Sequence, residues 1–179
     1  RWIAEIIVLG DLNDETRVVD LGAGNGILGI GCHLAGAATT LLVEKDVRCQ
    51  HDYEGVDVAR ANEMMATLGD SLGTLPGTEI EGLIIQTVDD FSYSDPVDQM
   101  VSSNQGIRII FEGGARIVLR LSGTGTVGVT LRVYLERYEN NPELLQQDPQ
   151  LALAPIIRTA EQIAQIQKFT GRNTPDVKT

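Results

Sequence analysis

Two arginines flank a short segment whose residue types suit the binding of an anion. Arg120 and Arg132 stand on either side of residues 122–128, which read Ser-Gly-Thr-Gly-Thr-Val-Gly. Hydroxyl groups and the exposed amides of a glycine-rich loop donate hydrogen bonds to an anion, and guanidinium groups add positive charge. We therefore predict a phosphate clamp; the alternative is a flexible hairpin tip with two solvated arginines. The residues assigned to the clamp are Arg120, Ser122, Gly123, Thr124, Gly125, Thr126, Thr130 and Arg132.

A second group of glycines follows an apolar segment near the start of the chain. Residues 17–21 indicate a buried strand, a glycine turn follows at 22–26, and residues 27–35 are small and apolar enough for a helix. Residues 39–43 indicate another buried strand, followed by an acidic residue that can accept hydrogen bonds from ribose hydroxyls. The pattern predicts a cofactor-binding turn or, alternatively, a truncated half-site without a ligand. The candidate cofactor-binding residues are Asp20, Gly22, Gly24, Asn25 and Glu44.

The predicted clamp lies between two segments with the alternation of half-buried strands. Residues 116–121 alternate arginine or valine with isoleucine or leucine, and residues 129–136 alternate valine or leucine with polar side chains. The apolar rows must share a core. If the two segments pair as a hairpin, we expect Arg120, Thr130 and Arg132 on the opposite face.

Other elements follow from periodicity and turn residues. We expect helices over residues 1–9, 53–72 and 148 to about 169, with Pro155 at a kink or in the first turn of the last one. Further strands are expected over residues 83–91 and 106–112. Together these elements predict an α+β chain, in which three or four C-terminal strands follow a short α/β, Rossmann-like fragment of the order helix-strand-helix-strand.

Composition limits the classes of partner. The chain of 179 residues carries 14 Lys and Arg against 25 Asp and Glu, for a formal net charge of -11. This charge argues against a groove that follows nucleic acid and against a basic membrane surface. The two cysteines, Cys32 and Cys49, have no metal-ligand spacing, so we expect reduced thiols and a cytoplasmic protein. We assign no catalytic residue and no metal ligand.

Four separated motifs carry a resemblance over about residues 51–179. They are residues 51–57 (HDYEGVD), 91–98 (FSYSDPVD), 103–108 (SNQGIR) and 120–126 (RLSGTGT). This part resembles the C-terminal domain of the phosphoglucomutase family, in the alpha-D-phosphohexomutase superfamily. The resemblance implies an α+β fold for this part, a C-terminal four-stranded antiparallel sheet with helices packed on one face. It also implies a glucose phosphate as ligand, and a loop in which Arg120, Ser122, Gly123, Thr124 and Arg132 grip the phosphate that is not transferred.

The same resemblance implies limits on activity. In that family the phosphoserine loop, the magnesium site and the sugar-reading loop lie on earlier domains, and their motifs are not found in this sequence. We therefore expect a phosphosugar-binding domain of an isomerase, inactive alone, that needs magnesium only together with the remaining mutase domains. Whether the chain is an enzyme stays open at this point.

Residues 1–48 resemble a different family. The run Val-Asp-Leu-Gly-Ala-Gly-Asn-Gly at 19–26 is similar to motif I of class I S-adenosylmethionine-dependent methyltransferases, which implies S-adenosylmethionine as a cofactor for this part. Three domains are therefore expected: a methyltransferase-like fragment at 1–48, a connecting helix at 49–78 and the phosphate-binding domain at 79–179. The alternatives are a methyltransferase-like protein and a composite, chimeric chain with no working site.

Overall fold

The chain divides into two compact units, Arg1–Asp46 and Val47–Thr179. The computed structural model describes residues 14–21, 32, 34, 36–43, 46–94, 101–102, 105–123, 128–141 and 143–179. Residues 49–78, expected as a separate connecting helix, fall within the second unit.

The first unit contains a pair of parallel strands. β1 (Arg17–Leu21) pairs with β2 (Thr39–Val43), with Arg17 opposite Thr39 and Leu21 opposite Val43. Both strands have the bounds expected from their apolar runs. The helix expected over residues 1–9 lies outside the described residues, as does most of the one at 27–35; of the latter, Cys32 and Leu34 are described and helical.

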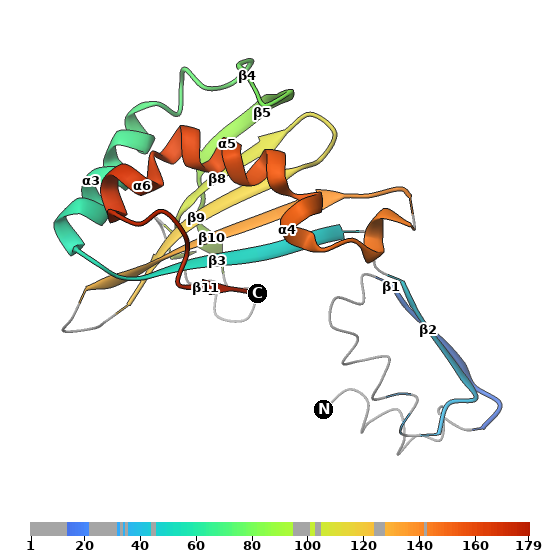
Figure 1. Cartoon of the computed structure of the whole chain (residues 1–179). Coiled ribbons are helices and arrows are strands. Elements are labelled where there is room, and N and C mark those ends of the chain that lie inside the picture. The colour runs from blue at the N-terminus through green and yellow to red at the C-terminus, as the bar shows by residue number, and fades with distance from the viewer. Residues whose placement is uncertain are drawn as a thin grey trace. The chain divides into compact units, whose positions relative to one another are not determined.

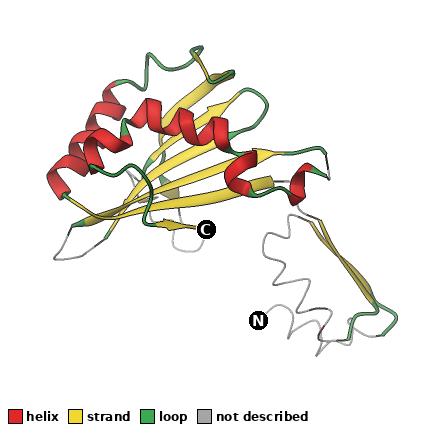
Figure 2. Cartoon of the chain, viewed as in Figure 1, coloured by secondary structure: helices red, strands yellow, loops and turns green. Residues whose placement is uncertain are grey.

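The second unit is built on one sheet of seven strands (Figures 1 and 2). Its order is β11 (Val177–Lys178), β3 (Asp46–Val56), β10 (Val129–Tyr138), β9 (Arg116–Ser122), β8 (Ile107–Phe111), β5 (Leu83–Asp90) and β4 (Glu79–Ile80). The pairs β10–β9, β9–β8, β8–β5, β5–β4 and β3–β11 are antiparallel. A separate short ladder joins β6 (Tyr93–Ser94) to β7 (Val101–Ser102). Among the described residues this sheet has seven strands, so the expected number of four is not matched.

The longest of the strands that sequence reasoning missed is β3. A helix was expected from Tyr53, but the chain is a strand as far as Val56, and α3 (Val58–Asp70) begins only after Asp57. The side chains of β3 do alternate, with Cys49, His51 and Tyr53 buried on one face. A buried histidine weakens the apolar pattern, because histidine is more often partly exposed than fully inside.

The helices of this unit begin and end at recognisable signals. Asp57 caps α3 by accepting a hydrogen bond from the Arg60 amide at 3.0 Å. The helix expected over 148–169 is three: α4 (Pro149–Ala152), α5 (Ala154–Ala164) and α6 (Ile166–Thr170). Pro155 lies in the first turn of α5, and Gln165, at φ 50°, separates α5 from α6. A further 3-10 turn, η1, spans Leu144–Gln146.

The helices α3, α5 and α6 cover one face of this sheet (Figure 2). Between them and the strands lies the core, whose members alternate along each strand. Fully buried side chains include Ile109, Phe111, Ile117, Leu119 and Leu131 from the sheet, Met64 and Ile156 from the helices, and Leu153 between α4 and α5. The alternate residues of β8, β9 and β10 therefore point to the other face, which we call the open face.

In the part of the chain that the structure describes, no helix is both long enough and apolar enough to cross a bilayer.

Candidate phosphate site

The β9–β10 register brings four residues of the predicted clamp together. Arg120 lies directly opposite Arg132, and Ser122 lies directly opposite Thr130. Their neighbours Leu119 and Leu131 are fully buried on the helix-covered face, so the four polar side chains belong to the open face. Two cross-strand pairs thus stand side by side at the end of the hairpin. Of the remaining clamp residues, Gly123 is described, and Thr124, Gly125 and Thr126 lie outside the described residues.

Gly128 ties the hairpin to the end of β3. Its φ is +87°, and a Cβ at this position would lie 2.7 Å from the carbonyl oxygen of Val56 and 2.9 Å from the carbonyl carbon of Gly55. Real Cβ atoms do not approach backbone so closely, and a positive φ favours glycine. The missing side chain therefore allows the end of β3 to pass against the loop end of the hairpin at Gly128.

Arg132 faces an acidic residue of β3. Its Nε lies 3.8 Å from the Asp52 Oδ2, which makes an ion pair but not a hydrogen bond. The other oxygen of Asp52 accepts a hydrogen bond from the Gln50 side chain at 2.7 Å. The Nε of Arg132 is buried and has no hydrogen-bond partner among the described residues. A charged donor of this kind gains most when an anionic acceptor enters.

Arg120 is held in a different way. Its Nε donates to the backbone carbonyl of Gln105 at 2.9 Å, and its Nη2 donates to the side-chain oxygen of the same residue at 3.2 Å. The guanidinium also lies over the Phe91 ring, 6.0 Å from its centre, a distance at the limit of a cation–π contact. These acceptors orient the guanidinium without cancelling its charge.

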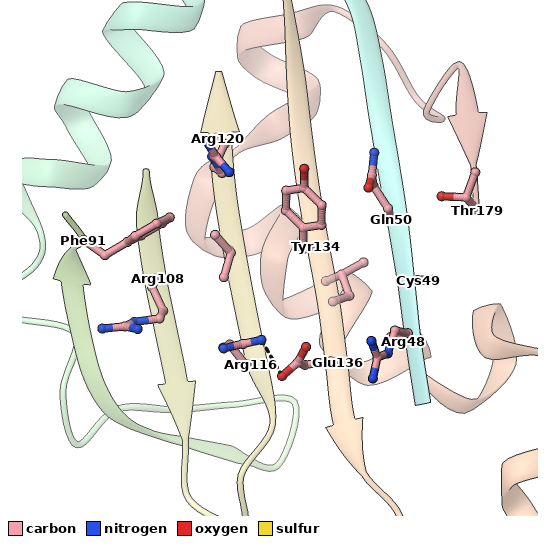
Figure 3. A pocket seen from close by; sticks show the side chains of 12 residues that line it. Arg48, Cys49, Gln50, Phe91, Arg108, Arg116, Arg120, Tyr134, Glu136 and Thr179 are labelled. Carbon is pink, nitrogen blue, oxygen red and sulfur yellow. Dashed lines mark ion pairs between the residues drawn. The ribbon is translucent and has the colours of Figure 1, made fainter. Parts of the chain in front are cut away.

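A cavity of about 500 Å³ opens on the open face beside the hairpin. Figure 3 shows Arg48, Arg108, Arg116 and Arg120 around it, with Phe91 and Tyr134 among the other lining residues. Arg120 therefore belongs both to the predicted clamp and to the cavity lining. Sequence reasoning did not find this cavity, although the alternation of Arg116, Val118 and Arg120 placed one of its walls.

Two arginines of the cavity already have carboxylate partners. Arg108 makes a bidentate pair with Asp89, at 3.0 and 2.7 Å, and the hydrogen bonds to Asp89 raise the pKa of the guanidinium. Arg116 pairs with Glu136, directly opposite on β10, at 2.8 Å (Figure 3, dashed line). Both pairs are partly exposed, so their contribution to stability is small. They do reduce the charge available to a ligand.

Three ionisable side chains of β3, Cys49, His51 and Tyr53, are buried in the core. His51 is 4% exposed, and its Nε2 lies 2.7 Å from the Gln150 side-chain oxygen; burial lowers its pKa. Burial likewise raises the pKa of the Cys49 thiol, and raises that of Tyr53 to about 12. A thiol with a raised pKa is a poor nucleophile at neutral pH. We therefore assign no reactive role to these three groups.

Most residues of the predicted cofactor-binding turn lie outside the described residues. Asp20 is the fourth residue of β1, but Gly22, Gly24, Asn25 and Glu44 lie outside the described residues. Within the described part of the chain, no three His, Cys, Asp or Glu side chains gather as a set that could hold a metal ion.

The comparisons with known proteins concern the second unit. The family described as "Phosphoglucomutase-1, C-terminal domain" matches residues 45–176. A phosphoglucomutase of Rhizobium radiobacter is 55% identical over 130 residues, which are 73% of this chain and 24% of that protein. Human phosphoglucomutase-1 is 43% identical over 136 residues, 73% of this chain and 24% of that protein.

A solved structure agrees with these relatives. The open form of the exocytosis-sensitive phosphoprotein parafusin, a phosphoglucomutase from Paramecium, has a TM-score of 0.64 at 43% identity. The similarity covers 75% of this chain and 22% of that one. The chain thus spans about a quarter of the length of the curated relatives that it matches. Residues 1–44 lie outside the family match, and these comparisons do not support the methyltransferase resemblance.

Proposed function

Because this chain belongs to the phosphoglucomutase-1 C-terminal domain family over residues 45–176, we propose that its β9–β10 hairpin binds the phosphate group of a phosphorylated hexose. The ligand would be a glucose phosphate, as for a domain of an enzyme that interconverts glucose 1-phosphate and glucose 6-phosphate. The phosphate would accept hydrogen bonds from Arg120, Ser122, Thr130 and Arg132, and from the amides and hydroxyls of Gly123, Thr124, Gly125 and Thr126.

The observation that carries the proposal is the direct opposition of Arg120 and Arg132. Two like charges placed opposite each other on neighbouring strands destabilise a sheet. A phosphate dianion between the two guanidinium groups converts this repulsion into two charge-assisted contacts. The hydroxyls of Ser122 and Thr130, the next pair along the same face, lie where they can donate to the remaining phosphate oxygens.

The proposal assigns binding to this chain, and not turnover. Phosphoryl transfer requires an aligned nucleophile and neutralisation of the charge that develops on the reacting phosphate. A clamp on a distant phosphate supplies binding energy and orientation to such a reaction. Catalysis would need the other domains of a full-length phosphoglucomutase. We propose these domains as the partner of this one.

Titration with inorganic phosphate and with glucose 6-phosphate, followed by the amide NMR signals, tests the proposal. We expect saturable shifts confined to residues 120–132. Replacing Arg132 by Gln should weaken binding by about 2 kcal/mol, roughly 30-fold, because a hydrogen bond to a charged group is worth about 1.5–3 kcal/mol.

The matched control is Arg158→Gln, which removes the same charge from α5, where Arg158 pairs with Glu81. Its phosphate affinity should equal that of the parent chain. An absence of shifts in residues 120–132, or equal losses in the two variants, would show that the hairpin is not the site.

A further inference from the structure

The arginines of the open face differ in the charge of their partners. Arg108 and Arg116 each pair with a carboxylate, at 2.7 and 2.8 Å, and Arg132 has Asp52 at 3.8 Å. No carboxylate of the described residues lies within ion-pair distance of Arg120, whose hydrogen bonds go to the neutral oxygens of Gln105. A neutral acceptor orients a guanidinium as a carboxylate does, but it does not neutralise the positive charge, which stays available to a ligand.

The backbone beside Gln105 comes unusually close to β9. A Cβ on Gly106 would lie 2.3 Å from the carbonyl oxygen of Leu119 and 2.7 Å from the Cγ of Arg120. Gly106 has φ +144°, a conformation that side chains with a Cβ rarely adopt. The glycine thus lets residues 105–106 lie directly on the stem of Arg120.

The position of Gln105 is also fixed from its other side. Its backbone amide donates to the Phe91 carbonyl at 3.0 Å, and the Phe91 amide donates to the Gly106 carbonyl at 3.0 Å. The Phe91 ring in turn lies under the guanidinium groups of Arg108 and Arg120, 5.7 and 6.0 Å from its centre. The backbone that carries Gln105 is therefore tied to the same aromatic residue that Arg120 contacts.

We propose that Gln105 is a positioning residue for phosphate binding: its neutral oxygens hold the Arg120 guanidinium in place, so that the arginine meets the phosphate with its charge uncompensated. This inference rests on the proposed function and adds the residue that prepares one of the two opposed arginines. It predicts that the charge of residue 105, more than its contacts, decides the affinity.

Two nearly isosteric substitutions separate positioning from a structural role. Gln105→Glu keeps an acceptor for Arg120 and adds a negative charge, so it should hold the arginine at least as firmly and leave stability unchanged or higher. Gln105→Met removes the side-chain acceptor and adds no charge. For inorganic phosphate, we expect Gln105→Glu to bind roughly tenfold more weakly than the parent and Gln105→Met about two- to threefold more weakly.

Stability by urea unfolding and affinity by NMR titration should therefore rank the variants in opposite orders. If Gln105→Glu binds phosphate as tightly as the parent, or more tightly than Gln105→Met, the inference is wrong while the proposed function stands. If the parent chain itself shows no phosphate-dependent shifts at residues 120–132, both fall. The Nε–H signal of Arg120, measured without ligand and identified by its loss in Arg120→Lys, should be protected from exchange; rapid exchange would refute the hydrogen bond to Gln105.

Discussion

Replacement of Gly106 by Ala tests the close approach that supports the site. The added Cβ would meet the Leu119 carbonyl oxygen at 2.3 Å, and this backbone atom cannot swing aside as a side chain could. Holding a non-glycine residue at φ +144° costs about 1–3 kcal/mol. Forcing extra atoms into packed surroundings costs about 1–3 kcal/mol more. We therefore expect a loss of about 3 kcal/mol or more, a large share of the 5–15 kcal/mol typical of a domain.

Urea unfolding measures this loss, and Gly114→Ala is the matched control. Gly114 also has a positive φ, +86°, but no described atom lies within 4 Å of the position of its Cβ. It should lose only the backbone cost, about 1–2 kcal/mol. The difference between the two variants isolates the steric contribution at Gly106. If Gly106→Ala loses no more stability than Gly114→Ala, the close approach of residues 105–106 to β9 does not exist.

Two further predictions concern stability. Burial lowers the pKa of His51 below 6.5, so below about pH 6.5 the unfolded chain binds more protons than the folded chain. The contribution of neutral His51 to the free energy of unfolding is therefore complete above about pH 6.5 and declines as the pH falls below that value. His51→Leu should flatten the dependence between about pH 5 and 7 in urea unfolding; parallel curves for the two proteins would contradict this. Asp148 accepts a hydrogen bond from the Gln150 amide at 2.8 Å and caps α4, so Asp148→Ala should lower the unfolding free energy by about 1 kcal/mol. Asp148→Asn, which keeps an acceptor, should lose less, and an equal loss would rule out the cap.

Much of the sheet could be predicted where the pattern along a strand was clean. The strands around Ile109, Ile117 and Leu131 alternate apolar and polar residues, and the structure places helices on the apolar side. Alternation predicted that Arg120 and Arg132 share one face of a hairpin, and the structure supplied the register that places them directly opposite each other. Local alternation suffices here because a strand exposes successive side chains to opposite faces.

The missed elements depend on partners far away in the chain. β3 was obscured by a buried histidine, whose polar nitrogen is satisfied by Gln150 on α4. The short strand β11 exists only because Val177 and Lys178 pair with Asp52 and His51. Two residues carry too little pattern to indicate a strand, and only the pairing makes them one. The seven-stranded sheet was therefore beyond reach of periodicity alone.

The candidate site divides in the same way. The types and spacing of Arg120, Ser122, Thr130 and Arg132 indicated anion chemistry before any fold was known. Only the tertiary structure decided which arginine keeps its charge: Asp89 and Glu136 take up Arg108 and Arg116, while Gln105, 15 positions away, orients Arg120 with neutral oxygens. The physical reason is that side-chain chemistry is a property of each residue, whereas the effective charge of an arginine depends on the partners that strand pairing brings beside it.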